Sequence, residues 1–172
     1  MSLRLLTRYG LSRHPPGGGG AKTAIESWAT PGATTAPGIT RLGWVFTVGA
    51  VPVTVEALRH FAAAASSNEW RIMIHRNSDS EIMAQVDIAY VAADEGTWVS
   101  EGVTPVVLAA STAYTISGRR LTGNLIYWEP TGVVMASEVT VTNSGVYGSS
   151  DARPTTNTGG DYRPVADFEF TV

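Results

Sequence analysis

The sequence predicts an all-β protein: an antiparallel, jelly-roll-like β-sandwich of about nine strands behind an extended N-terminal arm. Apolar and polar side chains alternate with a period of two along many short segments, which is typical of strands with one buried and one wet face. Turn-forming clusters such as NSDS, ADEG and TNSG separate these segments. The 172 residues include 18 glycines and 9 prolines, which indicates a single domain with many turns and few long helices.

The predicted domain covers residues 41–172. In its first strand, 42–48, Trp44 falls in phase with apolar neighbours, and Trp70 does so in the strand 70–76, so we expect both in the core. His75 then points outward. The other predicted strands cover residues 51–61, 81–91, 103–109, 113–119, 124–129, 133–141 and 164–172, with residues 62–67 as a loop.

The last strand, 164–172, shows the alternation most clearly. Phe168 and Phe170 share one face, whereas Asp167 and Glu169 fall on the other. We therefore expect Asp167 on the wet face of its sheet.

The predicted arm covers residues 1–40 and differs from the domain in charge. Four basic residues, the last of them Lys22, precede the first acid, Glu26, so the first 25 residues carry +4 and the remainder, with 8 basic and 15 acidic residues, carries −7. The run HPPGGGG and the later Pro31 and Pro37 favour an extended chain. Such an arm has few large apolar groups with which to order itself, so we expect neighbouring chains to hold it.

Composition argues against several classes of function. The net charge of −3 does not fit a nucleic-acid binder, and no apolar run is long enough to span a membrane. The chain has no cysteine and no recognisable metal-ligand, nucleophile or phosphate-loop spacing, since GGGGAKT lacks the glycines of a P-loop. We therefore expect no enzyme activity, no catalytic residue, no metal and no cofactor.

Aromatic residues leave a sugar-binding function open, because their faces stack on pyranose rings. Trp98, Tyr127 and Trp128 are the candidates for a glycan site, since none is clearly committed to the core. An exposed aromatic patch could equally bind protein.

From Leu42 onward the chain resembles a bacterial and phage β-sandwich domain of unknown function, found beside secreted sugar-active modules and in tailed-phage particle proteins. The similar segments are LGWVFTV (42–48), VTVEALRHF (53–61), TWV (97–99), TPVVLAASTAY (104–114), GVY (145–147), RPTTNT (153–158) and YRPVADFEF (162–170). Ser111 stands where the family has glycine, and Ala166 interrupts its usual Val-Asp pair. The resemblance implies a β-sandwich and no catalytic residues.

These observations predict a tailed-phage virion protein, assembled in the host cytoplasm and most specifically a capsid decoration (cement) protein whose arm clamps neighbouring shell subunits. Its partners would be the major capsid protein or other virion subunits and further copies of itself, with a trimer compatible with closed symmetry. The arm residues expected to bind partners are Leu3, Arg4, Leu5, Leu6, Arg8, Tyr9, Arg13, Ile25 and Trp28. The alternatives are a tail or baseplate component and a carbohydrate-binding adhesion module. Removal of residues 1–40 is expected to leave a folded sandwich.

Overall fold

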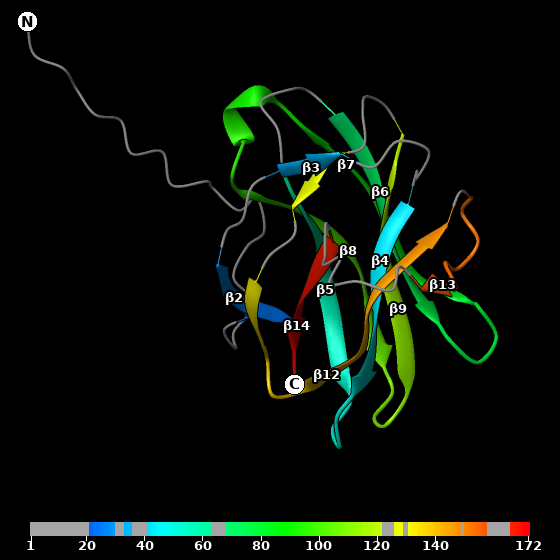
Figure 1. The fold of residues 1–172 in the computed structure, drawn as a ribbon. Coiled ribbons are helices and arrows are strands. Elements are labelled where there is room, and N and C mark those ends of the chain that lie inside the picture. Colours follow the sequence, from blue (N-terminus) through cyan, green and yellow to red (C-terminus); the bar gives the residue numbers. More distant parts are fainter. Residues whose placement is uncertain are drawn as a thin grey trace, which may run out of the picture.

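The chain is all-β, as the sequence predicts, and its antiparallel sheets form a sandwich-like arrangement (Figure 1). The computed structural model describes residues 21–29, 33–35, 41–62, 68–121, 126–128, 131–148, 150–157 and 166–172. Within these ranges there are fourteen strands and one 3-10 turn, η1 (Ala92–Asp94), and no α-helix.

Two main sheets make up the sandwich. The four-stranded sheet has the order β1 (Lys22–Thr23), β14 (Ala166–Thr171), β5 (Val53–Phe61) and β8 (Trp98–Leu108). The six-stranded sheet has the order β13 (Thr156–Asn157), β12 (Val139–Gly148), β4 (Arg41–Val48), β9 (Ala113–Arg120), β6 (Asn68–Arg76) and β7 (Ile82–Tyr90). Two further pairs, β2 (Ile25–Ala29) with β11 (Thr131–Met135) and β3 (Ala33–Thr35) with β10 (Ile126–Trp128), join the N-terminal strands to the segment between β9 and β12.

The core lies between the two main sheets and consists largely of aromatic rings. Phe168 of β14 packs against Trp44 and Phe46 of β4, with ring centroids 6.4 and 5.1 Å apart. The Trp44 indole N–H donates a 2.8 Å hydrogen bond to the Ala166 carbonyl, so its one polar atom is satisfied in the core. Trp44 and Trp70 are 2 % and 0 % exposed, which confirms their predicted place.

Gly43 allows β4 to lie close to β9. A Cβ at this position would lie 2.1 Å from the Ile116 carbonyl oxygen and 2.6 Å from the Ser117 Cβ, both far inside contact distance. No larger residue fits there without moving backbone, so Gly43 sets the spacing of the two strands that carry Arg41 and Ser117.

Ser111 has a φ of 53°, in the left-handed region that glycine adopts most easily. It lies in the turn between β8 and β9, where its N–H donates to the carbonyls of Val48 and Gly49.

The N-terminal boundary of the domain differs from the prediction. Residues 22–35, predicted as part of the arm, supply β1, β2 and β3, which pair with β14, β11 and β10. Figure 1 shows β2 beside β11 and β3 beside β10. The reason is that distant strands provide open edges for these short segments, which the local sequence does not reveal.

Two other predicted segments need comment. The strand expected over residues 133–141 is broken at a turn, where the Val139 N–H donates to the Ala136 carbonyl, so that β11 and β12 are separate. Of the predicted loop 62–67, Ala62 lies just past β5, and residues 63–67 lie outside the described residues.

Candidate functional site

The first candidate region is the contact between β1–β2 (residues 22–29), which we call the strap, and the outer face of the four-stranded sheet. Ile25 of the strap is 3 % exposed. Its N–H donates to Asp167 Oδ1 at 3.2 Å, and its carbonyl accepts from Arg59 Nη2 at 2.9 Å. Arg59 Nε in turn donates to Asp167 Oδ2 at 2.6 Å. Two strands and the strap are thus joined through one buried ion pair.

Asp167 is fully buried, contrary to its predicted place on a wet face. The strap covers that face, so the alternation along β14 correctly orients the side chain but does not reveal its burial. Burial raises the pKa of Asp167 to about 6, and the charge and hydrogen bond of Arg59 oppose this rise. The desolvation of the carboxylate outweighs its pairing.

An aromatic cluster continues this contact. Trp28 of the strap stacks on Trp98 of β8 with ring centroids 5.0 Å apart, and Phe61 meets Trp28 edge-on at 4.7 Å. The Arg59 guanidinium carbon lies 4.5 Å from the centre of a Trp98 ring, within cation–π range. A sugar would have to compete with these contacts for the faces of Trp98.

The other predicted glycan residues belong to β10, where Tyr127 pairs with Thr34 and Trp128 with Ala33. Their side chains lie outside the described part of the structure. The strand β10, which contains two of the predicted glycan-binding residues, is therefore hydrogen-bonded to β3, a segment predicted as part of the arm.

The predicted partner-binding residues fall into two groups. Ile25 and Trp28 contact the domain of their own chain. Ile25 is buried there and presents no surface to a partner. The remaining members, which are Leu3, Arg4, Leu5, Leu6, Arg8, Tyr9 and Arg13, lie outside the described residues.

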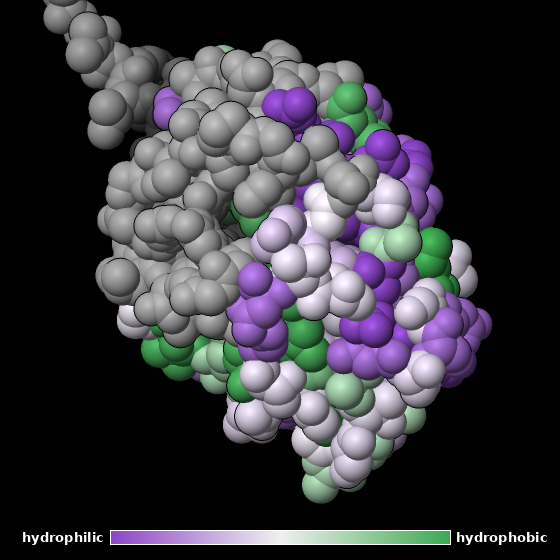
Figure 2. All heavy atoms as spheres, turned by 45° about the vertical axis from the view of Figure 1, so that its right-hand side comes forward, coloured by the Kyte–Doolittle hydropathy of each residue, from purple (hydrophilic) through white to green (hydrophobic). Residues whose placement is uncertain are grey.

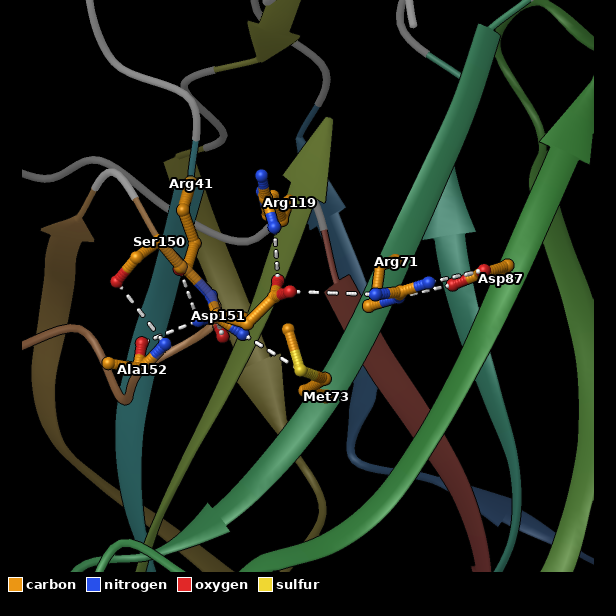
Figure 3. A network of polar contacts seen from close by, with 9 residues as sticks. Arg41, Arg71, Met73, Asp87, Arg119, Ser150, Asp151 and Ala152 are labelled. Atoms are coloured by element: carbon orange, nitrogen blue, oxygen red, sulfur yellow. Dashed lines mark hydrogen bonds and ion pairs between the residues drawn. The ribbon is translucent and has the colours of Figure 1, made fainter. Parts of the chain in front are cut away.

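The second candidate region is a network of arginines on the outer face of the six-stranded sheet (Figure 3). Arg41 of β4 is 0 % exposed, and its hydrogen bonds to described residues all go to neutral groups. Its guanidinium donates to the carbonyls of Ser150 and Ala152, to Ser117 Oγ at 2.9 Å and to the Met73 sulfur at 3.1 Å. Burial lowers the pKa of Arg41 to about 10. This side chain holds the segment 150–152 against the sheet.

Asp151 is the centre of the network. Figure 3 shows its carboxylate between two arginines, with Oδ1 2.7 Å from Arg119 Nη1 and Oδ2 3.5 Å from Arg71 Nη1. The hydrogen bond from Arg119 is the main reason that the pKa of Asp151 lies below its usual value. Arg71 also makes two hydrogen bonds to Asp87, of 2.7 and 2.8 Å, which form a bidentate pair across β6 and β7.

His75 lies on the same face and is 1 % exposed. The sequence predicts it on the outward face of its strand, and residues after β12 fold back over that face and bury it. Neither ring nitrogen has a hydrogen-bond partner of normal geometry among the described residues. Burial, and then the charge of Arg41, lower the pKa of His75 to about 4, so the ring is neutral at pH 7.

This network is not predicted from the sequence. Its signal was the outward phase of polar residues in two predicted strands, 70–76 with Arg71 and His75, and 113–119 with Ser117. That signal becomes informative only when the strand order β4-β9-β6 is known, since it is the order that makes Arg41, Ser117 and Met73 neighbours.

The described residues contain no cluster of three or more metal-ligating side chains, and none of their helical segments could span a membrane. The sequence matches no model of a known protein family, and no curated protein is significantly similar to it. Functional argument therefore depends on the two regions described above.

Proposed function

We propose that this chain is a structural protein of a tailed-phage particle, and specifically a capsid decoration protein whose N-terminal segment clamps neighbouring shell subunits. The feature that supports this role best is the strap. Lys22 and Thr23 pair with Phe170 and Glu169 at the edge of β14. On the outer face of the sheet, the buried Arg59–Asp167 pair binds the backbone of Ile25 in the strap. The segment before residue 21 therefore departs from a defined point at the sheet edge.

Charge favours the same role. Residues 1–20 contain three basic residues and no acid, or +3, whereas residues 21–172 contain 9 basic and 15 acidic residues, or −6. A segment of 20 residues spans at most about 70 Å when extended, enough to cross a neighbouring subunit. A cationic segment that leaves an acidic domain suits binding to acidic surfaces of other subunits.

The strap also changes how the role must be tested. Removal of residues 1–40, which the sequence predicts to leave a folded sandwich, would delete β1, β2 and β3 and expose the edges of β14 and β11. The full chain should be kept, and the charges of its N-terminal segment should be changed instead.

The experiment is gradient sedimentation of a phage lysate, with mass spectrometry of the fractions. We expect the chain to sediment with intact particles in hundreds of copies. The variant R4Q/R8Q/R13Q should leave the particle fraction. A control that lowers the net charge by the same three units at exposed domain positions, Q85E/A89E/T104E, should remain bound.

Each other outcome has a definite meaning. A handful of copies per particle would replace the decoration role with a tail or baseplate role. Chain that stays in the soluble fraction would overturn the virion proposal altogether. Equal release of both charge variants would overturn the clamp, because the loss would then reflect net charge and not the N-terminal segment.

A further inference from the structure

The arginine network concentrates positive charge in an acidic domain. Eight arginines follow Glu26 in the sequence, and four of them lie in or beside this network. These are Arg41, Arg71, Arg119 and Arg153, the last lying within electrostatic reach of His75. Asp151 and Asp87 supply two negative charges, so the local balance is +2.

The least exposed member of the network, Arg41, has no hydrogen bond to a carboxylate among the described residues. Among the described residues, Arg41 donates only to carbonyls, a hydroxyl and a thioether, and the charge of Asp151 acts on it without a hydrogen bond. Arg119 shares the Asp151 carboxylate with Arg71. A buried guanidinium is ordinarily paired with an anion, because an uncompensated charge away from water is costly.

One unused donor points the same way. The Nε atom of Arg119 is buried and has no hydrogen-bond partner among the described residues. Buried polar atoms are usually satisfied. An acceptor atom of a ligand would satisfy this donor.

Asp151 indicates the chemistry of that ligand. Its carboxylate is an oxyanion held between two guanidinium groups, tightly by Arg119 and loosely, at 3.5 Å, by Arg71. The side chain of Asp151 is 42 % exposed, and those of Arg71 and Arg119 are 28 % and 31 % exposed. Solvent and small solutes thus reach the groups that hold it.

We propose that Arg71 and Arg119, backed by Arg41 and His75, form a binding site for an oxyanion, a carboxylate or phosphate group, which Asp151 partly occupies. The described part of the face in Figure 2 intersperses hydrophilic and apolar residues and has no single broad apolar area. The site is independent of the proposed virion role.

The test is an NMR titration of the full chain with sodium phosphate, against sodium chloride at matched ionic strength. The chain has three histidines, so labelled imidazoles give few signals. We expect the His75 signals to shift saturably with phosphate and its pKa to rise, because a bound anion offsets the charge of Arg41. A shift that is linear, or that chloride reproduces, would overturn the site.

Three variants make the test specific. R119Q should weaken phosphate binding about tenfold, equivalent to about 1.4 kcal/mol. D151N should tighten it, because the internal competitor is lost. R76Q should bind as the unchanged chain does, since Arg76 lies outside the network and pairs with Asp79 and Glu81. Equal weakening in R119Q and R76Q, or weakening in D151N, would overturn the proposal.

A second titration, with sodium acetate, identifies the source of the oxyanion. Tighter binding of phosphate than of acetate would indicate a phosphate group, and the reverse a carboxylate. If R119Q does not fold, R119K keeps the charge but loses the planar fork, and it should weaken binding in a folded protein. Unchanged binding in folded R119K would overturn the role of Arg119.

Discussion

The two sheets of this sandwich each have an outer face that alternation predicts to be wet, and each is covered in a different way. The strap covers the four-stranded sheet with a buried aliphatic side chain, an aromatic stack and strand pairing. The segment 150–152 covers the six-stranded sheet through carbonyls and a carboxylate held by arginines. The first cover is mainly apolar around one buried ion pair, whereas the second is a polar contact made by arginines, of which Arg41 is buried.

This difference has an energetic meaning. Apolar burial is non-directional and tolerates salt, whereas contacts among partly exposed charges weaken with ionic strength. Amide exchange in the strap should therefore depend little on salt. The segment 150–152 should respond to anions and salt.

The largest expected effect is from R59M, which leaves the buried carboxylate of Asp167 without its cation. We expect the free energy of unfolding to fall by about 3–5 kcal/mol at pH 7.5. Urea unfolding followed by tryptophan fluorescence measures this. The control R76M removes an arginine from surface ion pairs, and an equal loss in both variants would show that the strap contact is not stabilised by the buried pair.

The variant R41M tests the other cover. It leaves the carbonyls of Ser150 and Ala152 without their donor, at a cost of about 2–3 kcal/mol. Amide hydrogen exchange should accelerate in residues 150–157 of R41M and in residues 22–29 of R59M. Equal acceleration of both segments in either variant would contradict the independence of the two covers.

Asp167 also gives the strap a dependence on pH. Its folded pKa of about 6 lies above the unfolded value, so the folded state binds the proton more tightly. The resulting stability is fully present below about pH 4 and is lost as the pH rises through 6. Against D167N, which does not titrate, the natural chain should lose about 2 kcal/mol between pH 4.5 and 7.5. A constant difference across this range would disprove the assignment.

The smallest effect is expected from K22A. Lys22 bonds to Glu138, but its side chain is 51 % exposed. Exposed pairs contribute about 0.2–1 kcal/mol, so K22A should change the unfolding free energy by less than R59M does. The pKa of Glu138, held down mainly by this hydrogen bond, should rise in K22A when followed by NMR. A loss as large as that of R59M would mean that the exposed Lys22–Glu138 pair holds the strap as strongly as the buried Arg59–Asp167 pair does.

The sequence predicts the sandwich well because alternation records which face of each strand meets the core. Trp44, Trp70 and Phe168 follow directly from that pattern. The position of the two covering segments is not predictable in this way. Residues 22–29 and 150–152 have no periodicity that indicates which sheet face they pack against. Asp167 lies 142 residues from Ile25, and only the fold brings them together.

The same limit applies to the candidate site. His75 was assigned the correct face of its strand, but a polar outward residue ordinarily indicates solvent. Its burial depends on the return of the chain after β12 and on the neighbouring β4 and β9. A pattern in one strand cannot contain that information.

The pairing of Lys22 with Phe170 places residue 21 beside the last strand of the domain, so the polypeptide enters and leaves the fold at one edge. A short linker could join Val172 to Ala21, and new ends could be opened in the exposed turn at Asn77–Ser80 between β6 and β7. Such a circular permutant should fold, since termini that lie close together permit this rearrangement. The order in which the strands are connected would then be separable from the order in which they pair.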